Sequence, residues 1–200
     1  VQAEFLSSTG VAATFREWKE QSEISRFEFY SGRLKSSILE LAHKSGMNTD
    51  KIPVIVSGMA SSSIGMEEIP YAELPFRING SQASVRVFDD YNGSGAPLII
   101  VSGVKSNVDV MRGEEAQLIG LVQLNQVKLE DNEEYVFVFP GTHSKHISVK
   151  GGLVPDFKTF MTGELFNIVS EHSILKDSVV LDNSIKLSAP AAKEAFVYGV

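Results

Sequence analysis

Residues 135–160 read YVFVFPGTHSKHISVKGGLVPDFKTF, and this stretch does most to decide the fold that the sequence predicts. An apolar run over 135–140 ends in a turn of small and basic residues. Further runs over 146–149 and 153–160 are separated by the turn at 150–152. Aromatic and β-branched runs bounded by Gly and Pro are typical of strands joined by tight turns. The stretch therefore predicts a β-meander, and the apolar residues after it predict a helix.

The residues before the meander alternate between strand and helix patterns. Short apolar runs predict strands over 1–6, 53–57, 84–88 and 98–102. Residues 13–45 predict two helical pieces, and Gly46 is suited to end the second one. That second helix carries an apolar stripe with helical spacing, formed by Phe27, Tyr30, Leu34, Ile38 and Leu41. The pattern is that of an α/β protein, and the charged segment at 125–134 suggests a domain boundary between residues 132 and 133.

The stretch over 107–120, NVDVMRGEEAQLIG, places a cation, a glycine and two carboxylates where a helix over 114–124 begins. Arg112 offers a planar fork of donors that suits a carboxylate or phosphate, and Gly113 lets the backbone approach a ligand closely. The adjacent Glu114 and Glu115 could accept a proton or help to hold a metal. The same residues also fit an ordinary helix start, because the helix dipole favours Glu in the first turn.

Only one of the two carboxylates is expected to face a cleft, because neighbours on a helix point about 100° apart. Glu115 lies in line with the apolar residues of the helix, so Glu114 is the preferred candidate. Those apolar residues are Leu118, Ile119 and Val122.

Two other windows contain candidate ligand groups. Gly141 and Thr142 could present N–H groups and a hydroxyl to a phosphate, with Lys145 adding charge. His143 could orient a substrate, or it could have a structural role beside the turn. Residues 54–71 run from a buried-type strand into a Gly/Ser loop, the usual place for ligand loops in α/β proteins. A polar loop that simply leaves the strand would show the same pattern.

Composition limits the classes of partner. Hydrophobic residues make up 43% of the chain, enough for a sizeable core, and the formal charge of −7 argues against nucleic acid or an anionic membrane as a partner. The absence of cysteine excludes disulfides and thiolate metal sites. No apolar run is long enough for a transmembrane helix and no signal peptide is evident, so we expect a cytoplasmic protein.

Four ordered motifs in the chain resemble those of the 2-dehydro-3-deoxygalactonokinase family. They are Ser57-Gly58-Met59 followed by Gly65, Glu68, Pro70 and Tyr71; Val110 to Leu118; Pro140 to Lys145; and Met161 to Phe166. Three positions depart from the family pattern, with Met66, Ala116 and His146 standing where the family has Trp, Thr and Trp. These departures concern the shape of the substrate pocket more than the class of reaction. The family's first phosphate loop and adenosine segment have no counterpart here, so we expect an internal fragment.

The resemblance implies an actin-like (ribonuclease H-like) sugar kinase fold, with most of domain I over 1–132 and the start of domain II over 133–200. It also implies transfer of the ATP γ-phosphoryl group, with Mg²⁺ bridging the phosphates, to the terminal hydroxyl of 2-dehydro-3-deoxy-D-galactonate. A non-catalytic sugar-acid-binding module or a truncated kinase is the alternative. A hydrolase that uses Ser144 and His143 is disfavoured, because adjacent strand residues point to opposite faces. Sugar-acid stereochemistry and a homodimeric state stay open.

The resemblance also suggests roles for individual residues. Arg112 would clamp the substrate carboxylate or a phosphoryl oxygen, and Glu114 or Glu115 would accept the hydroxyl proton or orient a water bound to Mg²⁺. No metal ligands are assigned. The turn Gly141-Thr142 with Lys145 would hold the ATP phosphates. The residues expected to contact the sugar acid, besides Arg112, are Ser57, Gly58, Met59, Ser61 and His143.

Overall fold

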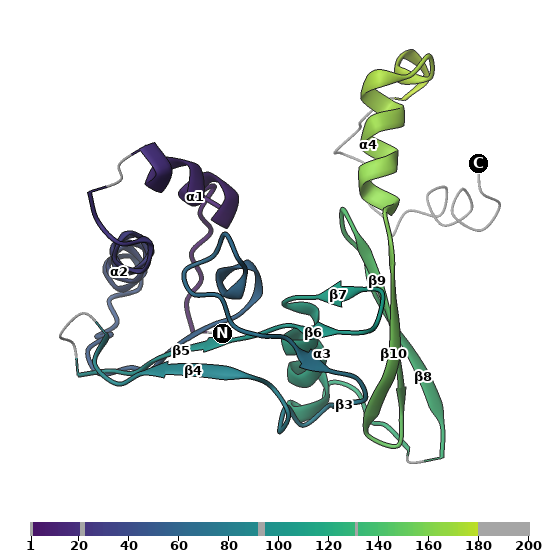
Figure 1. Cartoon of the computed structure of the whole chain (residues 1–200), viewed down its shortest axis with the longest axis horizontal. Coiled ribbons are helices and arrows are strands. Elements are labelled where there is room, and N and C mark those ends of the chain that lie inside the picture. The colour runs from purple at the N-terminus through teal and green to yellow at the C-terminus, as the bar shows by residue number, and fades with distance from the viewer. Residues whose placement is uncertain (1, 21–22, 92–94, 131, 180–200) are drawn as a thin grey trace. The chain divides into compact units, whose positions relative to one another are not determined.

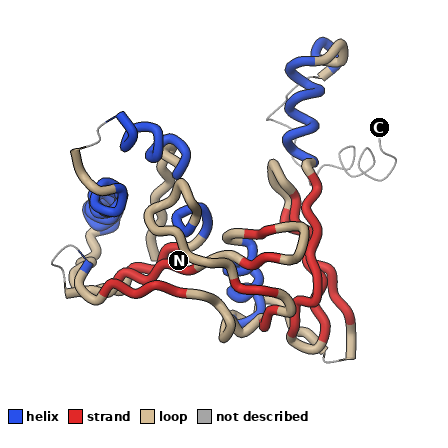
Figure 2. The backbone as a smooth tube through the Cα atoms, in the orientation of Figure 1, coloured by secondary structure: helices blue, strands red, loops and turns tan. Residues whose placement is uncertain are grey.

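The computed structural model describes residues 2–20, 23–91, 95–130 and 132–179. The chain forms two compact units, one of residues 1–139 with 145–160 and the other of residues 140–144 with 161–200. Figures 1 and 2 trace the elements of both units. The bounds of these units differ from the expected division between residues 132 and 133, which stays a prediction. The architecture is mixed α/β, as predicted from the sequence.

The first part of the larger unit is a small sheet covered by helices. The sheet has the order β1-β5-β4, with β1 (Val54–Val56) parallel to β5 (Leu98–Val101), and β4 (Val85–Phe88) antiparallel to β5. Helix α1 (Val11–Glu20) precedes helix α2 (Arg26–Ser45). Four of the five predicted stripe residues of α2 pack in one core with Leu98 and Ile100 of β5, namely Phe27, Tyr30, Leu34 and Ile38.

Local sequence signals account for the ends of α2. The Ser25 hydroxyl accepts the N–H of Glu28, and the Glu28 carboxylate accepts the N–H of Ser25, which together form a capping box. Gly46 adopts a left-handed conformation with φ 68°, as predicted for the residue that ends the helix. The prediction of a strand over 1–6 is wrong for the described residues 2–6, which form no strand. This segment has no ladder partner among the described residues, and its apolar residue Leu6 is exposed.

The second part of the larger unit contains the predicted meander. Strands β8 (Glu134–Phe139), β9 (Ser144–Lys150) and β10 (Leu153–Phe160) are consecutive neighbours, and β3 (Phe76–Arg77) pairs with the outer edge of β10. Figure 2 shows these long strands side by side. The meander is therefore confirmed.

A short three-stranded sheet leads into the candidate site. Strand β2 (Ala72–Glu73) is parallel to β6 (Val104–Lys105), and β6 is antiparallel to β7 (Val110–Met111). Helix α3 (Glu114–Gln123) begins three residues after β7. Met111, Leu118 of α3 and Ile147 of β9 are buried in one core, which holds the start of α3 against the meander.

The smaller unit consists of the turn at 140–144 and the segment from residue 161 onward. Helix α4 (Thr162–His172) is followed by the short helix η3 (Lys176–Ser178). No residue of α4 is buried, although the helix carries several large apolar side chains. They include Leu165, Phe166, Ile168 and Val169. Within the described part of the chain, no helix combines the length and apolar character needed to cross a membrane.

Candidate functional site

The loop after β1 and the loop after β7 meet through two glycines. Gly58 begins the 3-10 helix η1 (Gly58–Ser61) with φ 83°, and Gly113 precedes α3 with φ 112°. Both values lie in the region of φ that L side chains rarely adopt. A Cβ atom built on Gly113 would lie 3.5 Å from the Cα of Gly58, so the backbones are in contact. Two windows singled out from the sequence, more than fifty residues apart, are thereby brought together.

Arg112 lies at this junction with its guanidinium group over the ring of Tyr71, 4.4 Å from the ring centroid. One of its terminal nitrogens, Nη1, is buried and has no hydrogen-bond partner among the described residues. Leaving a buried charged donor unpaired is unfavourable, so Arg112 would gain from an acceptor, and its covered Nη1 must shift to meet one supplied by a ligand. Arg112 thus has the features expected of an anion-binding residue.

The two carboxylates at the start of α3 bend back over the loop before the helix. The Arg112 N–H donates to Glu114 Oε2 over 2.9 Å, and the Gly113 N–H donates to Glu115 Oε2 over 2.7 Å. Both bonds satisfy donors at the helix start and explain why the chain turns into a helix here. Glu115 is buried in line with Leu118, as the helical spacing predicts, whereas Glu114 is half-buried.

Burial also changes the acidity of Glu115, which is only 1% exposed. Desolvation is the largest cause that raises the pKa of its carboxyl group, the negative charge of Glu114 adds to it, and the net value is about 7. Hydrogen bonds from the N–H groups of Glu115 and Gly113, and the charge of Arg112, lower the pKa and only partly offset these effects. Its second oxygen, Oε1, has no hydrogen-bond partner among the described residues. Glu115 therefore exchanges a proton near neutral pH.

The residues expected to contact the sugar acid differ in accessibility. Ser57 and Met59 are exposed beside Gly58, so their side chains are available to a ligand. Ser61 is fully buried, and its hydroxyl donates to the carbonyl of Gly58 over 3.2 Å, which closes the η1 turn. Ser57, Gly58 and Met59 are thus the part of the loop with access to a ligand, and contact with substrate stays a prediction for all four residues.

Lys145 lies in a buried polar network of the larger unit. Its ammonium group donates to the carbonyl of Val110 and the hydroxyl of Thr159, and it lies 3.5 Å from Asp109 Oδ1. Thr159 also donates to Asp109 Oδ2 over 2.6 Å. Burial raises the pKa of Asp109, but the hydrogen bonds from Thr159 and the Val110 N–H, with the charge of Lys145, outweigh it and leave the pKa below its usual value. Lys145 would have to leave three acceptors to bind a phosphate.

The predicted phosphate turn is docked on the start of α4 within the smaller unit. The Glu164 N–H donates to the Thr142 carbonyl over 3.1 Å, and the Glu164 carboxylate pairs with His143 Nε2. A Cβ atom on Gly163 would lie only 2.7 Å from the Gly141 carbonyl oxygen, so the contact requires glycine. Gly141 and Thr142 are exposed, and no hydrogen bond between described residues uses their N–H groups. These N–H groups are available to an anion.

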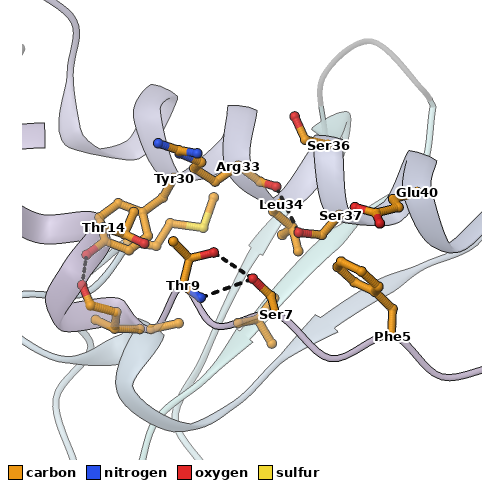
Figure 3. Close-up of a pocket in the computed structure, with 14 residues that line it drawn as sticks. Phe5, Ser7, Thr9, Thr14, Tyr30, Arg33, Leu34, Ser36, Ser37 and Glu40 are labelled. Carbon is orange, nitrogen blue, oxygen red and sulfur yellow. Dashed lines mark hydrogen bonds between the residues drawn. The ribbon is translucent and has the colours of Figure 1, made fainter. Parts of the chain in front are cut away.

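The described residues show no group of metal ligands, and the cavity beside α2 is not lined by the predicted site residues. Among the described residues, no three His, Asp or Glu side chains are grouped as metal ligands. A cavity of about 340 Å³ lies between residues 5–11 and α2, where Ser7 and Thr9 face Tyr30 and Arg33 (Figure 3). None of the site residues predicted from the sequence lines it.

Several partners in the site were not predicted from the sequence. The sequence shows Tyr71 as part of a motif but does not indicate its contact with Arg112. It also does not show which residues pair with Asp109, Thr159 and Glu164. A buried lysine requires a counter-charge, but the sequence offers many carboxylates and does not show which one is near. Pairings between distant segments depend on the register of the strands.

Three comparisons place the chain among known proteins. A family model described as 2-keto-3-deoxy-galactonokinase matches residues 13–200. The 2-dehydro-3-deoxygalactonokinase of Escherichia coli (strain K12) is 32% identical over 130 residues, which cover 63% of this chain and 40% of that protein. A Rhizobium meliloti (strain 1021) protein named provisionally as the same enzyme is 32% identical over 148 residues, covering 72% of this chain and 46% of that protein.

A solved structure agrees with these relatives. A crystal structure from Sinorhizobium meliloti, of a protein assigned provisionally as a 2-dehydro-3-deoxygalactonokinase, has a TM-score of 0.61 and 28% sequence identity to this chain. The match covers 82% of this chain and 53% of that one. In each case the chain spans about half, or less, of the length of the protein that it matches.

Proposed function

This chain belongs to the 2-keto-3-deoxy-galactonokinase family, and from that premise we propose that the protein containing it is an ATP-dependent sugar-acid kinase. It transfers the γ-phosphoryl group of ATP to the terminal hydroxyl of 2-dehydro-3-deoxy-D-galactonate and forms the 6-phosphate. The observation that carries the proposal is Arg112, whose guanidinium nitrogen Nη1 is buried and unpaired among the described residues and whose backbone N–H is bound by the carboxylate of Glu114. An anion-binding donor and a proton acceptor together suit a substrate with both a carboxylate and a reacting hydroxyl.

The larger unit supplies the groups for the sugar acid. Arg112 binds the substrate carboxylate, and the exposed loop of Ser57, Gly58 and Met59 contacts the remainder of the molecule. Glu114 accepts the proton of the attacking hydroxyl, because it is the more accessible of the two carboxylates. Glu115, which is neutral for part of the time near pH 7, supports the loop through the N–H of Gly113.

The smaller unit supplies groups for the nucleotide. The exposed N–H groups of Gly141 and Thr142, with the Thr142 hydroxyl, bind the phosphates of ATP. His143 belongs to the same turn and pairs with Glu164 of the smaller unit, and its contact with the sugar acid is proposed from the family resemblance alone. Because Lys145 is engaged by Asp109 and Thr159, its contribution to phosphate binding is the weakest of these assignments.

Mg²⁺ would accompany ATP in this proposal and would supply positive charge to its phosphates. Magnesium is usually held by one or two carboxylates, phosphate oxygens and waters, so a site without three clustered protein ligands among the described residues fits it. We further propose an actin-like kinase fold for the complete protein and a cytoplasmic location, as expected from the family resemblance.

The test is a coupled assay of ATP consumption on the complete gene product, across a panel of 2-keto-3-deoxy sugar acids. We expect turnover with 2-dehydro-3-deoxy-D-galactonate. Arg112→Lys should lose roughly 2 kcal/mol of transition-state binding, because an ammonium group cannot reproduce the planar fork. The matched control is Arg86→Lys, at an exposed pair with Glu67. No transfer to any acid of the panel would refute the proposal, and acid binding without transfer would favour a non-catalytic binding module.

A further inference from the structure

Three residues form a row across the ends of the strands of the β2-β6-β7 sheet. The register pairs Ala72 with Val104 and Val104 with Met111. Because β2 and β6 are parallel while β6 and β7 are antiparallel, the next row outward contains Tyr71, Gly103 and Arg112. Residues aligned in a row point to the same face of a sheet. Tyr71 and Arg112 therefore share a face, with Gly103 between them.

The middle position of this row must be glycine. A Cβ atom on Gly103 would lie 2.2 Å from the Met111 carbonyl oxygen and 3.1 Å from the Cβ of Arg112. Neighbouring strands lie about 4.8 Å apart, so side chains two strands apart meet only if the middle residue leaves room. The Arg112 guanidinium reaches the Tyr71 ring across this gap.

The backbone fixes the Tyr71 ring relative to Arg112. The N–H of Ala72, the residue after Tyr71, donates to the carbonyl of Gly103 over 3.0 Å. The Arg112 N–H is bound by Glu114, and the Gly113 N–H by Glu115. Both ends of the contact are thus anchored before a ligand arrives. Such preorganisation reduces the entropy that binding must overcome.

We propose that Tyr71 is a positioning residue whose ring holds the Arg112 guanidinium so that Nη1 meets the carboxylate of the substrate. The π face stabilises the cation on one side, and Nη1 lacks a partner among the described residues until an acid binds. The inference rests on the proposed function for the identity of the acid. Tyr71 raises the affinity for the substrate by holding Arg112 and does not need to touch the substrate itself.

The kinetic test compares Tyr71→Leu with Tyr71→Phe in the complete gene product. Tyr71→Leu removes the aromatic face, and we expect it to raise KM for the sugar acid about tenfold, with little change in KM for ATP or in kcat. Tyr71→Phe keeps the ring and should restore values close to those of the wild type. Unchanged KM in Tyr71→Leu, or equal damage in both variants, would overturn the proposal.

A spectroscopic arm separates this inference from the proposed function. The Nε–H resonance of Arg112 should be displaced by the Tyr71 ring current in the wild type and in Tyr71→Phe. Titration with pyruvate, a simple 2-oxo acid, should move that resonance further in the wild type. If no sugar acid is phosphorylated, the proposed function fails. The titration with pyruvate still shows whether the Tyr71 ring positions Arg112 to bind an acid. A wild-type resonance without a ring-current shift, or one unmoved by pyruvate, would overturn the inference even if Tyr71→Leu does not fold.

Discussion

At the scale of single residues, one step along α3 separates two carboxylates with different environments. Glu114 is half-buried beside the loop, while Glu115 is buried next to the core residue Leu118. The same residue type is therefore half-buried at one position and enclosed by the core at the next. Desolvation is the main cause, because the charged form of a buried carboxyl loses its hydration.

Glu115 should make stability depend on pH in the direction opposite to that of most carboxylates. Its pKa rises from 4.5 to about 7 on folding, so between these values the folded state keeps a proton that the unfolded state has lost. The free energy of unfolding therefore falls as pH rises through this window. Each unit of the pKa shift contributes roughly 1.4 kcal/mol, so the protein is less stable by about 3 kcal/mol above the window than below it. Glu115→Gln should match the wild type near pH 4 and exceed it near pH 8.

Urea unfolding at both pH values measures this difference. Glu114→Gln is the matched comparison: it removes a charge that helps to raise the pKa of Glu115, so the pH dependence should keep its direction and become smaller. A wild type and a Glu115→Gln variant with parallel pH profiles would show that Glu115 is not desolvated as described.

The buried Lys145 gives a second prediction at this scale. Lys145→Met removes the cation beside Asp109 and the ammonium donor to the Val110 carbonyl, and removing one partner of a buried pair costs about 3 kcal/mol. Lys105→Met, at an exposed pair with Glu73, should cost less than about 1 kcal/mol. Urea unfolding of both variants measures the contrast. Equal losses would mean that the Lys145 network adds nothing to stability.

At the scale of elements, α4 and the 140–144 turn form one structural piece although strands β9 and β10 lie between them in the chain. The helix start holds the turn through the Glu164 N–H and the close approach of Gly163. If this turn binds phosphate, the start of α4 holds its N–H groups in position. The Met161 to Phe166 motif then has a physical role without touching the nucleotide.

Gly163→Ala tests this coupling. The added Cβ would lie 2.7 Å from the Gly141 carbonyl oxygen and 2.9 Å from the Thr142 Cα, so the turn or the helix must shift. Overpacking of this kind costs about 1–3 kcal/mol. We expect faster hydrogen exchange at the Glu164 amide and weaker binding of ATP by the complete gene product.

Gly32→Ala is the control for that substitution. Gly32 is an interior residue of α2, and a Cβ atom added there would have no neighbour within 4 Å outside its own helix backbone. Alanine at this position should be neutral or stabilising by about 0.5–1 kcal/mol. Unchanged exchange at Glu164 in Gly163→Ala would contradict the proposed docking of the turn.

At the scale of the whole molecule, the chain exposes apolar side chains on an open sheet edge. Strand β4 is the outer strand of its sheet, and its residues Val85 and Val87 are 53% and 50% exposed. Unpaired edge strands with exposed apolar residues favour pairing with a second chain. The 200-residue chain should therefore self-associate at high concentration.

Charged residues at the β4 edge should reduce that association. The double variant Val85→Lys and Val87→Lys places like charges along the edge, a device that natural edge strands use against pairing. Light scattering after a sizing column should show a lower mean mass for the variant than for the wild type. Arg86→Lys, on the same strand, serves as the control. A wild type that stays monomeric at every concentration would contradict the prediction.

The sequence by itself determined the features that depend on local periodicity and local geometry. The stripe of α2, the left-handed Gly46 and the strands of the meander follow from residues within one or two turns of each other. The division between a buried Glu115 and an accessible Glu114 also followed from helical spacing. The family motifs, read in order, identified the kinase family that the comparisons support.

Only the tertiary structure decided which distant residues meet. Tyr71 and Arg112 are paired through the register of three strands, and Lys145 is paired with Asp109 from the segment before β7. The same holds for residues 2–6, which have a strand-like pattern but no ladder partner among the described residues. The physical reason is that hydrogen-bond register, burial and counter-charge are properties of packed segments. A sequence shows which residues can pair, whereas packing selects the pair and fixes its environment.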